Sequence, residues 1–154
     1  MKDIQLQAEH ALKDLIDTDE LTLVEQLGMR AKATQKGEAG AVNFNPHLVY
    51  DGTTMGTLDD LRDLGRRLLS RWTRELYKVV CGSLDDDKTD RESIIKSLGI
   101  GDIAVGGAIA AVLVGTFAVA PAVATVIAAL IVKRIIKPAG EEICEYWGEK
   151  LKAD

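Results

Sequence analysis

The feature that most constrains this chain is a run of 30 residues, 103–132, that contains no ionisable side chain. We expect such a run to be kept out of water, because a large exposed apolar surface promotes aggregation. Its length is compatible with one membrane-spanning helix or with two helices joined by a bend. Pro121 favours the bend, because proline lacks a backbone N–H and clashes with the preceding helical turn. We therefore expect two arms, over 102–119 and 121–137, with Pro121 at the first helical position of the second arm.

The two arms are expected to pack against each other as a hairpin. Glycine and alanine recur at every fourth position on each arm, and small side chains let two helix backbones approach closely. The turn, residues 119–122, is apolar, whereas hairpin turns that face water usually carry Gly, Asn, Asp or Ser. The tip therefore belongs inside the protein, inside lipid or against a partner chain. The residues expected to pack the hairpin are Gly107, Ala111, Gly115, Pro121, Ala124 and Ala128.

Amphipathic helices are predicted on both sides of this hairpin, because apolar residues recur there with helical spacing behind capping residues. Thr89 and Glu92 match the capping box, and Asp102 is expected to cap the first arm. Trp147 is expected to anchor the last helix in the core, with a bilayer boundary as the alternative. The predicted helices cover residues 4–17, 19–35, 57–81, 89–98 and 139–152, the second of them capped by Thr18 or Asp19.

These elements predict an all-α fold, a single-domain bundle of six or seven helices around a central uncharged helical hairpin. A chain of 154 residues is short enough for one hydrophobic core. Within the single domain, 1–154, we expect an N-terminal helical pair over 1–35 and a long loop over 36–56. A helical core over 57–154 would then contain the apolar hairpin, 102–137.

The segment 37–56 is rich in glycine and has a length that is unusual for a connection inside a compact domain. It is expected to be either a packed structural loop, with one weak β-hairpin as an option, or a partner-recognition segment. The residues expected to contact a partner are Phe44, His47 and Tyr50.

Basic residues form two groups that are candidates for contact with anionic lipid or an acidic protein surface. A solvated helix face with ion pairs is the alternative interpretation. The net charge of −5 and the aromatic content of 5% disfavour nucleic acid as a partner. The basic residues are Arg67, Arg71, Arg74 and Lys78 on one predicted helix, and Lys133, Arg134 and Lys137 at the base of the hairpin.

The sequence predicts no enzyme, cofactor or metal site. His10 and His47 are the only imidazoles, and neither belongs to a recognised catalytic or metal-binding pattern. Cys81 and Cys144 are expected to be free thiols in a reducing cytosol, with one bridge between them as the less favoured alternative. The first residues do not form a signal peptide, so the expected location is cytoplasmic, with membrane association as an option.

The pattern over residues 57–152, amphipathic helices around an uncharged hairpin, resembles the pore-forming domain of colicins in outline, without a motif matched residue by residue. This resemblance implies a form that hides the hairpin in water and releases it at a membrane. We therefore expect a small non-enzymatic protein that acts through the hairpin, as a membrane-interacting, effector-like or toxin-like protein, or by docking on a protein partner or a second copy. The alternative is a soluble scaffold or adaptor with a permanently buried hairpin, which binds a protein through the 37–56 loop or the basic helix face.

Overall fold

The computed structural model describes residues 2–37 and 43–153. Within this part of the chain all regular structure is helical, which confirms the predicted all-α bundle. Seven of the described helices have 11 residues or more, in agreement with the six or seven predicted. They are α1 (Lys2–Leu15), α2 (Glu20–Gln35), α4 (Leu58–Cys81), α5 (Lys88–Leu98), α6 (Asp102–Gly115), α7 (Pro121–Ile131) and α9 (Ile143–Ala153).

Side-chain caps fix the starts of two of these helices as predicted. The Asp19 carboxylate accepts a hydrogen bond of 3.0 Å from the Thr22 backbone N–H at the start of α2. Hydrogen bonds from the Thr22 hydroxyl and then from its backbone N–H hold the pKa of the Asp19 carboxyl below its usual value. The Thr57 hydroxyl accepts a hydrogen bond of 3.1 Å from the Asp60 N–H and opens α4.

Two predicted caps are wrong. A 3-10 turn, η2 (Asp85–Asp87), leads directly into α5, so Thr89 already lies inside that helix and makes no capping box. Asp102 is likewise the first residue of α6, and its N-cap is Gly101, whose φ of 148° is accessible to glycine and strained for other residues. In both cases the residue that was predicted to be the N-cap already lies in the helix, so its side chain does not cap the helix.

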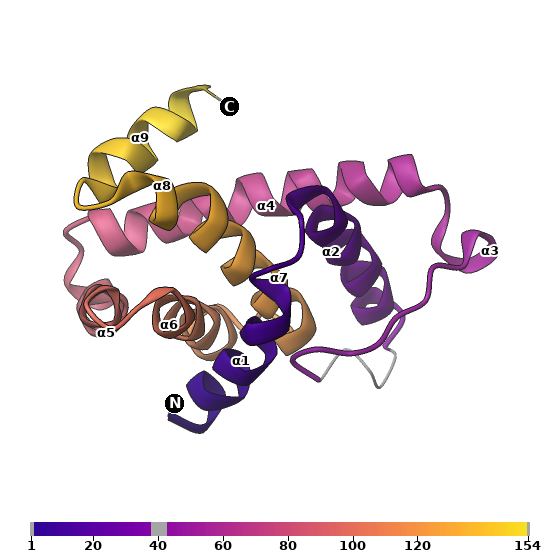
Figure 1. The fold of residues 1–154 in the computed structure, drawn as a ribbon, viewed down its shortest axis with the longest axis horizontal. Coiled ribbons are helices and arrows are strands. Elements are labelled where there is room, and N and C mark those ends of the chain that lie inside the picture. The colour runs from indigo at the N-terminus through magenta and orange to yellow at the C-terminus, as the bar shows by residue number, and fades with distance from the viewer. Residues whose placement is uncertain (1, 38–42, 154) are drawn as a thin grey trace.

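The charge-free run folds as two helices joined by a bend, as predicted, but the first helix ends at Gly115 instead of residue 119, and the bend covers 116–120 instead of 119–122. The second arm continues from α7 into a π-helical turn, η3 (Val132–Ile136), and the short helix α8 (Lys137–Ala139). Every residue from Ala122 to Val132 is buried. α7 runs through the middle of the molecule, where α1, α2, α4 and α6 pack against it, while α5 covers another side of α6 (Figure 1).

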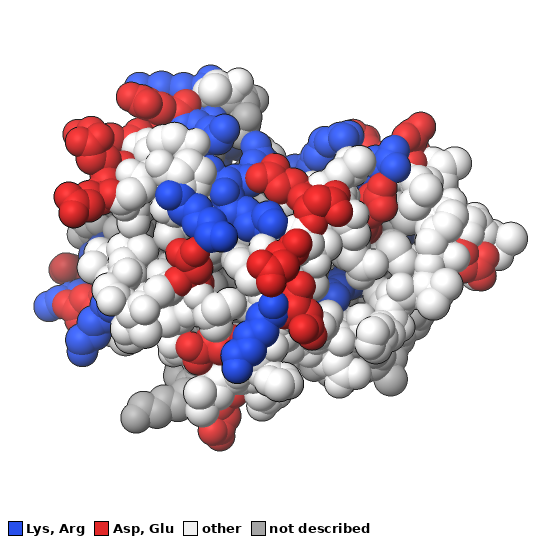
Figure 2. Space-filling view, viewed as in Figure 1, with Lys and Arg blue, Asp and Glu red and all other residues white. Residues whose placement is uncertain are grey.

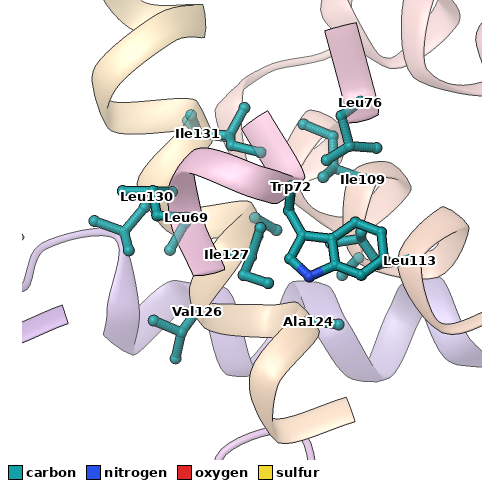
Figure 3. Packing of buried hydrophobic residues seen from close by; sticks show 14 of the residues in the cluster. Leu69, Trp72, Leu76, Ile109, Leu113, Ala124, Val126, Ile127, Leu130 and Ile131 are labelled. Carbon is teal, nitrogen blue, oxygen red and sulfur yellow. The ribbon is translucent and has the colours of Figure 1, made fainter. Parts of the chain in front are cut away.

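Figure 3 shows the part of the core around this hairpin where aliphatic side chains of α4, α6 and α7 meet the Trp72 ring. Trp72 of α4 packs edge-on against Phe117 at the hairpin bend, with ring centroids 5.5 Å apart. The apolar faces of the outer helices contribute side chains that cover the hairpin. The residues gathered in Figure 3 include Leu69 and Leu76 of α4, Ile109 and Leu113 of α6, and Ile127, Leu130 and Ile131 of α7.

The hairpin bend closes with a hydrogen bond of 2.9 Å from the Val119 N–H back to the Leu113 carbonyl. The bond spans six residues, one more than the 6→1 bond of a Schellman motif, but it shares with that motif a left-handed residue directly before the donor, a position where glycine is favoured. Here that residue is Ala118, with φ of 57°. The bend therefore carries backbone strain in exchange for an apolar side chain.

Replacing Ala118 with glycine is expected to raise the free energy of unfolding by about 1 kcal/mol, because it removes the left-handed strain of an L-residue. Urea unfolding monitored by circular dichroism measures the change. A fall in the urea midpoint would show that the Ala118 side chain contributes more through contacts than it costs in strain.

α2 and α4 cross at two glycines. A Cβ atom on Gly28 would lie 2.2 Å from the Leu61 carbonyl oxygen, and one on Gly65 would lie 2.2 Å from the Val24 carbonyl oxygen. These distances are well inside van der Waals contact, so each helix leaves room for the backbone of the other. The Arg62 guanidinium adds an ion pair of 2.7 Å to Glu25 across the same pair of helices.

The segment after α2 contains no strand in its described residues, so the optional β-hairpin is wrong. Residues 38–42 of the predicted loop lie outside the described residues. The remainder runs in an irregular conformation to a short helix, α3 (Gly52–Met55), which Asp51 caps through the Thr53 N–H at 3.0 Å.

The prediction of free thiols is wrong, because Cys81 and Cys144 form a disulfide with their Cα atoms 5.6 Å apart. The end of α4 and the first turn of α9 lie side by side, a proximity that no local pattern reveals. α9 starts four residues after the predicted start at residue 139, because Gly140 breaks the preceding helix with φ of 61°. Trp147 is fully buried, which confirms its expected place in the core.

Candidate functional site

The hairpin is the candidate functional element, and its predicted packing residues fall in different environments. Ala111, Ala124 and Ala128 are buried, and Pro121 begins α7 in a half-buried position. Gly107 is buried but faces α1, since a Cβ atom there would lie 2.5 Å from Glu9 Cγ. Gly115, the last residue of α6, is exposed. Because Gly107 has no side chain, α1 can lie close to α6 at this point.

Leucine at position 111 is expected to lower the free energy of unfolding by about 1 to 3 kcal/mol, because it overpacks a buried site. Leucine at position 115 is the matched control and is expected to change stability much less, because Gly115 is exposed. Thermal unfolding of the two variants measures the difference. Equal effects would show that the alanine at 111 is not tightly enclosed.

Polar contacts hold the hairpin at its bend and at its base. The Thr116 hydroxyl donates a hydrogen bond of 2.7 Å to the Asp90 carboxylate of α5. Lys137 Nζ lies 3.8 Å from the Asp102 carboxylate, which joins the two arms at their open end. Lys133 Nζ donates hydrogen bonds to the carbonyls of Ile16 and Thr18, at 2.9 and 2.6 Å. Lys133, a predicted lipid or partner contact, thus binds the end of α1.

Arg30 of α2 is a buried cation that the sequence analysis missed. Its side chain is 1% exposed and donates hydrogen bonds to the Ala122 carbonyl at 3.0 Å and to Asn45 Oδ1 at 2.7 Å. Its Nε has no hydrogen-bond partner among the described residues. Burial lowers the pKa of Arg30 to about 10, which leaves the guanidinium charged at neutral pH.

Arg30 connects the start of α7 to the segment after α2, because it also donates a hydrogen bond of 3.4 Å to the Phe44 carbonyl. A signal for its burial was present in the sequence. Arg30 follows Leu23 by seven residues and Leu27 by three, so it lies on the apolar face of its helix. An arginine at such a position is a candidate for a buried hydrogen-bonding role.

The predicted basic residues of α4, Arg67, Arg71, Arg74 and Lys78, are all exposed, and three of them lie near an acid or an aromatic ring. Arg67 lies 3.9 Å from Asp63, Lys78 lies 3.6 Å from Glu75, and the Arg71 guanidinium lies 4.9 Å from the centre of the Trp72 ring. Arg134 and Arg66 line a groove of about 600 Å³ together with Glu20. Figure 2 shows basic and acidic side chains intermixed on the face it presents.

The three residues predicted to contact a partner through the loop have different environments. Phe44 is half-buried and packs against the core, and the Tyr50 hydroxyl donates a hydrogen bond of 2.7 Å to the Gly56 carbonyl. His47 is exposed. Phe44 therefore pins the segment to the body of the protein, whereas the Tyr50 bond is local to the segment itself.

Among residues 2–37 and 43–153, no group of three or more His, Cys, Asp or Glu side chains is placed to hold a metal ion. Over the same residues, none of the helices combines the length and the apolar character that crossing a bilayer requires. No family model, curated protein or solved structure matches the chain.

Proposed function

We propose that this protein is a small, non-enzymatic, membrane-active protein, of effector or toxin-like type, that inserts the tip of its hairpin into a lipid bilayer. The observation that carries the proposal is the sheathing of a charge-free hairpin by amphipathic helices. Helices with one apolar face are the kind that can exchange a protein core for the surface of a bilayer. The same helices that cover the hairpin in water would then lie on the membrane.

The lengths of the helices favour partial insertion. α6 has 14 residues, which is about 21 Å at a rise of about 1.5 Å per residue. The hydrocarbon core of a bilayer is about 30 Å thick, so an arm of this length passes the mid-plane without reaching the far side. The hairpin would thus be a re-entrant element that disturbs lipid packing.

The bend is suited to an apolar environment. The N–H groups of Thr116 and Val119 are bonded to carbonyls of α6, and Pro121 has no N–H to satisfy. Unpaired backbone groups are costly in hydrocarbon, so each of these paired or missing donors lowers the cost of insertion. Ala118 is exposed at this bend, which places an apolar residue at the point that would enter lipid first.

The ties that retain the hairpin are few and lie at its ends. The Asp90–Thr116 and Arg30–Ala122 bonds hold the bend to α5 and α2, and the two bonds from Lys133 to the carbonyls of Ile16 and Thr18 hold the base. Between the ends, the hairpin is retained by apolar contacts, which a bilayer can replace. Release therefore requires that only a small number of polar bonds break.

Flotation with lipid vesicles and release of an entrapped dye test the proposal across pH and lipid composition. The informative variant is Ala118→Lys, with Ala118→Met as the matched control of similar length. A lysine deep in a bilayer costs about 2.5 to 3.5 kcal/mol, so the lysine variant should release dye roughly 70-fold more slowly or worse. The methionine variant should be as active as the unaltered protein, and thermal unfolding confirms that both variants fold.

Equal dye release by the lysine and methionine variants would show that the bend does not enter lipid. Failure of the unaltered protein to float with vesicles under any condition would overturn membrane activity altogether. That second result would support a scaffold that binds a protein partner through the 37–56 loop or the basic face of α4. The complete burial of α7 is the observation that favours this second function.

A further inference from the structure

The disulfide between α4 and α9 has one accessible end. Cys144 is exposed, whereas Cys81 is partly buried and packs against the hydrophobic core. A surface hollow of about 640 Å³ is lined in part by Cys144, so small molecules can approach the exposed end of the disulfide. The hollow is lined by Tyr77, Glu145, Gly148, Glu149, Leu151 and Lys152.

Apart from this bond, α9 is held mainly by apolar contacts, and Ile143, Tyr146 and Leu151 pack against the core without being fully buried. It has 11 residues, and a helix this short is marginal without tertiary contacts. Gly148 in its interior lowers its helical propensity further, although the glycine is needed because a Cβ atom would lie 3.1 Å from the Tyr77 hydroxyl. Trp147 is its one residue that is fully buried among the described residues, and its Nε1–H donates a hydrogen bond of 3.0 Å to the Thr73 carbonyl.

We propose that Cys144 Sγ is a site of thiol–disulfide exchange, and that its reduction by small neutral or cationic thiols frees α9 from α4. A thiolate attacks Cys144 Sγ and forms a mixed disulfide, while the Sγ–Sγ bond breaks and its electron pair leaves on Cys81 Sγ, which takes a proton from water. A second thiolate attacks the reagent's sulfur, releasing Cys144 as a thiolate. Two reagent thiols are thereby oxidised to a disulfide, and the protein disulfide gains two electrons.

The charges beside Cys144 determine which thiols react with it fastest. Glu145 and Glu149 contribute two negative charges to the hollow, and Lys152 contributes one positive charge. An anionic thiol is repelled by this net negative charge, and a thiol with an ammonium group is attracted. Salt screens exposed charges, so the selection should weaken as the ionic strength rises.

The rates at which different thiols reduce the Cys81–Cys144 disulfide test whether Cys144 is the sulfur that is attacked. The probes are cysteamine, 2-mercaptoethanol and 2-mercaptoethanesulfonate, each rate being normalised to that of the same thiol with hydroxyethyl disulfide. We expect cysteamine to be several-fold faster and the sulfonate several-fold slower than mercaptoethanol, with the spread reduced in Glu145→Gln/Glu149→Gln. Acid quenching early in the reaction should trap the cysteamine adduct on Cys144. An adduct mainly on Cys81, or equal normalised rates, would overturn the assignment.

Hydrogen exchange tests the consequence for α9. In the reduced protein we expect the amides of residues 143–153 to lose at least tenfold in protection, while α6 and α7 keep theirs. The variant Cys81→Ser/Cys144→Ser should show the same exchange pattern with and without reductant. Unchanged protection of α9 after complete reduction would contradict its release, whatever the outcome of the vesicle experiments.

Discussion

Alanine at position 65 is expected to lower the free energy of unfolding by about 3 kcal/mol, near the upper end of the usual cost of overpacking a core. The added methyl group would lie 2.2 Å from the Val24 carbonyl oxygen, which belongs to the backbone of α2 and cannot move alone. The two helices must therefore separate along their whole contact. Without that clash, replacing glycine with alanine inside a helix would raise the free energy of unfolding by about 1 kcal/mol. A fall in the free energy of unfolding therefore indicates the clash.

Urea unfolding at 25 °C measures this cost, and Gly99→Ala is the matched control. A Cβ atom on Gly99 meets nothing closer than 3.8 Å, so this variant should unfold at the same urea concentration as the unaltered protein or a higher one. Gly28→Ala should be as harmful as Gly65→Ala. The double variant should cost less than the sum of the two, because both substitutions open the same crossing. A Gly65→Ala variant as stable as the Gly99→Ala control would disprove the close approach of α2 and α4.

Loss of the disulfide is expected to cost about 4 kcal/mol of stability. The bond joins residues that are 63 apart in sequence, and the loop-entropy relation gives about 4 kcal/mol for a closed loop of this size. Urea unfolding with and without dithiothreitol measures the change. The Cys81→Ser/Cys144→Ser variant should match the reduced protein and should not respond to dithiothreitol. A midpoint unchanged by reduction would show that the bond does not restrict the unfolded chain as the relation assumes.

The parts of the fold that could be predicted are those encoded by near neighbours in sequence. The caps at Asp19 and Thr57 depend on residues three positions away, and the break at Pro121 depends on one residue and the turn before it. The absence of charge over 103–132 was enough to predict that most of this run is kept out of water, because a large exposed apolar surface promotes aggregation. These features follow from rules that operate within one or two helical turns.

The parts that could not be predicted depend on which helices meet. The small residues of the first arm predicted contact within the hairpin, yet Gly107 faces α1, because a groove of small side chains does not specify its partner. Gly28 and Gly65 each leave space for a backbone segment far away in sequence. The disulfide has the same origin, since its two cysteines become neighbours only after α9 folds back onto α4.

The candidate site was predicted in its apolar elements and missed in its polar ones. The hairpin and its apolar bend were expected, but the ties at Arg30 and Asp90 were not, because each joins the bend to a different helix. Lys133 and Lys137, candidates for contact with lipid or an acidic partner, bind carbonyls of the α1–α2 connection and the Asp102 carboxylate in the structure. A charged side chain next to an apolar segment can close the fold as readily as it can bind a ligand.

The most direct test of the account is hydrogen exchange at the bend, residues 115–120, in the presence and absence of vesicles under conditions that cause dye release. Gly115, Thr116 and Ala118 are exposed in water, so the amides of this segment are expected to exchange faster than those of α7. The account predicts that these amides become protected on vesicles, while α6 and α7 stay protected in both states. Exchange of residues 115–120 that is equally fast with bound vesicles would contradict it.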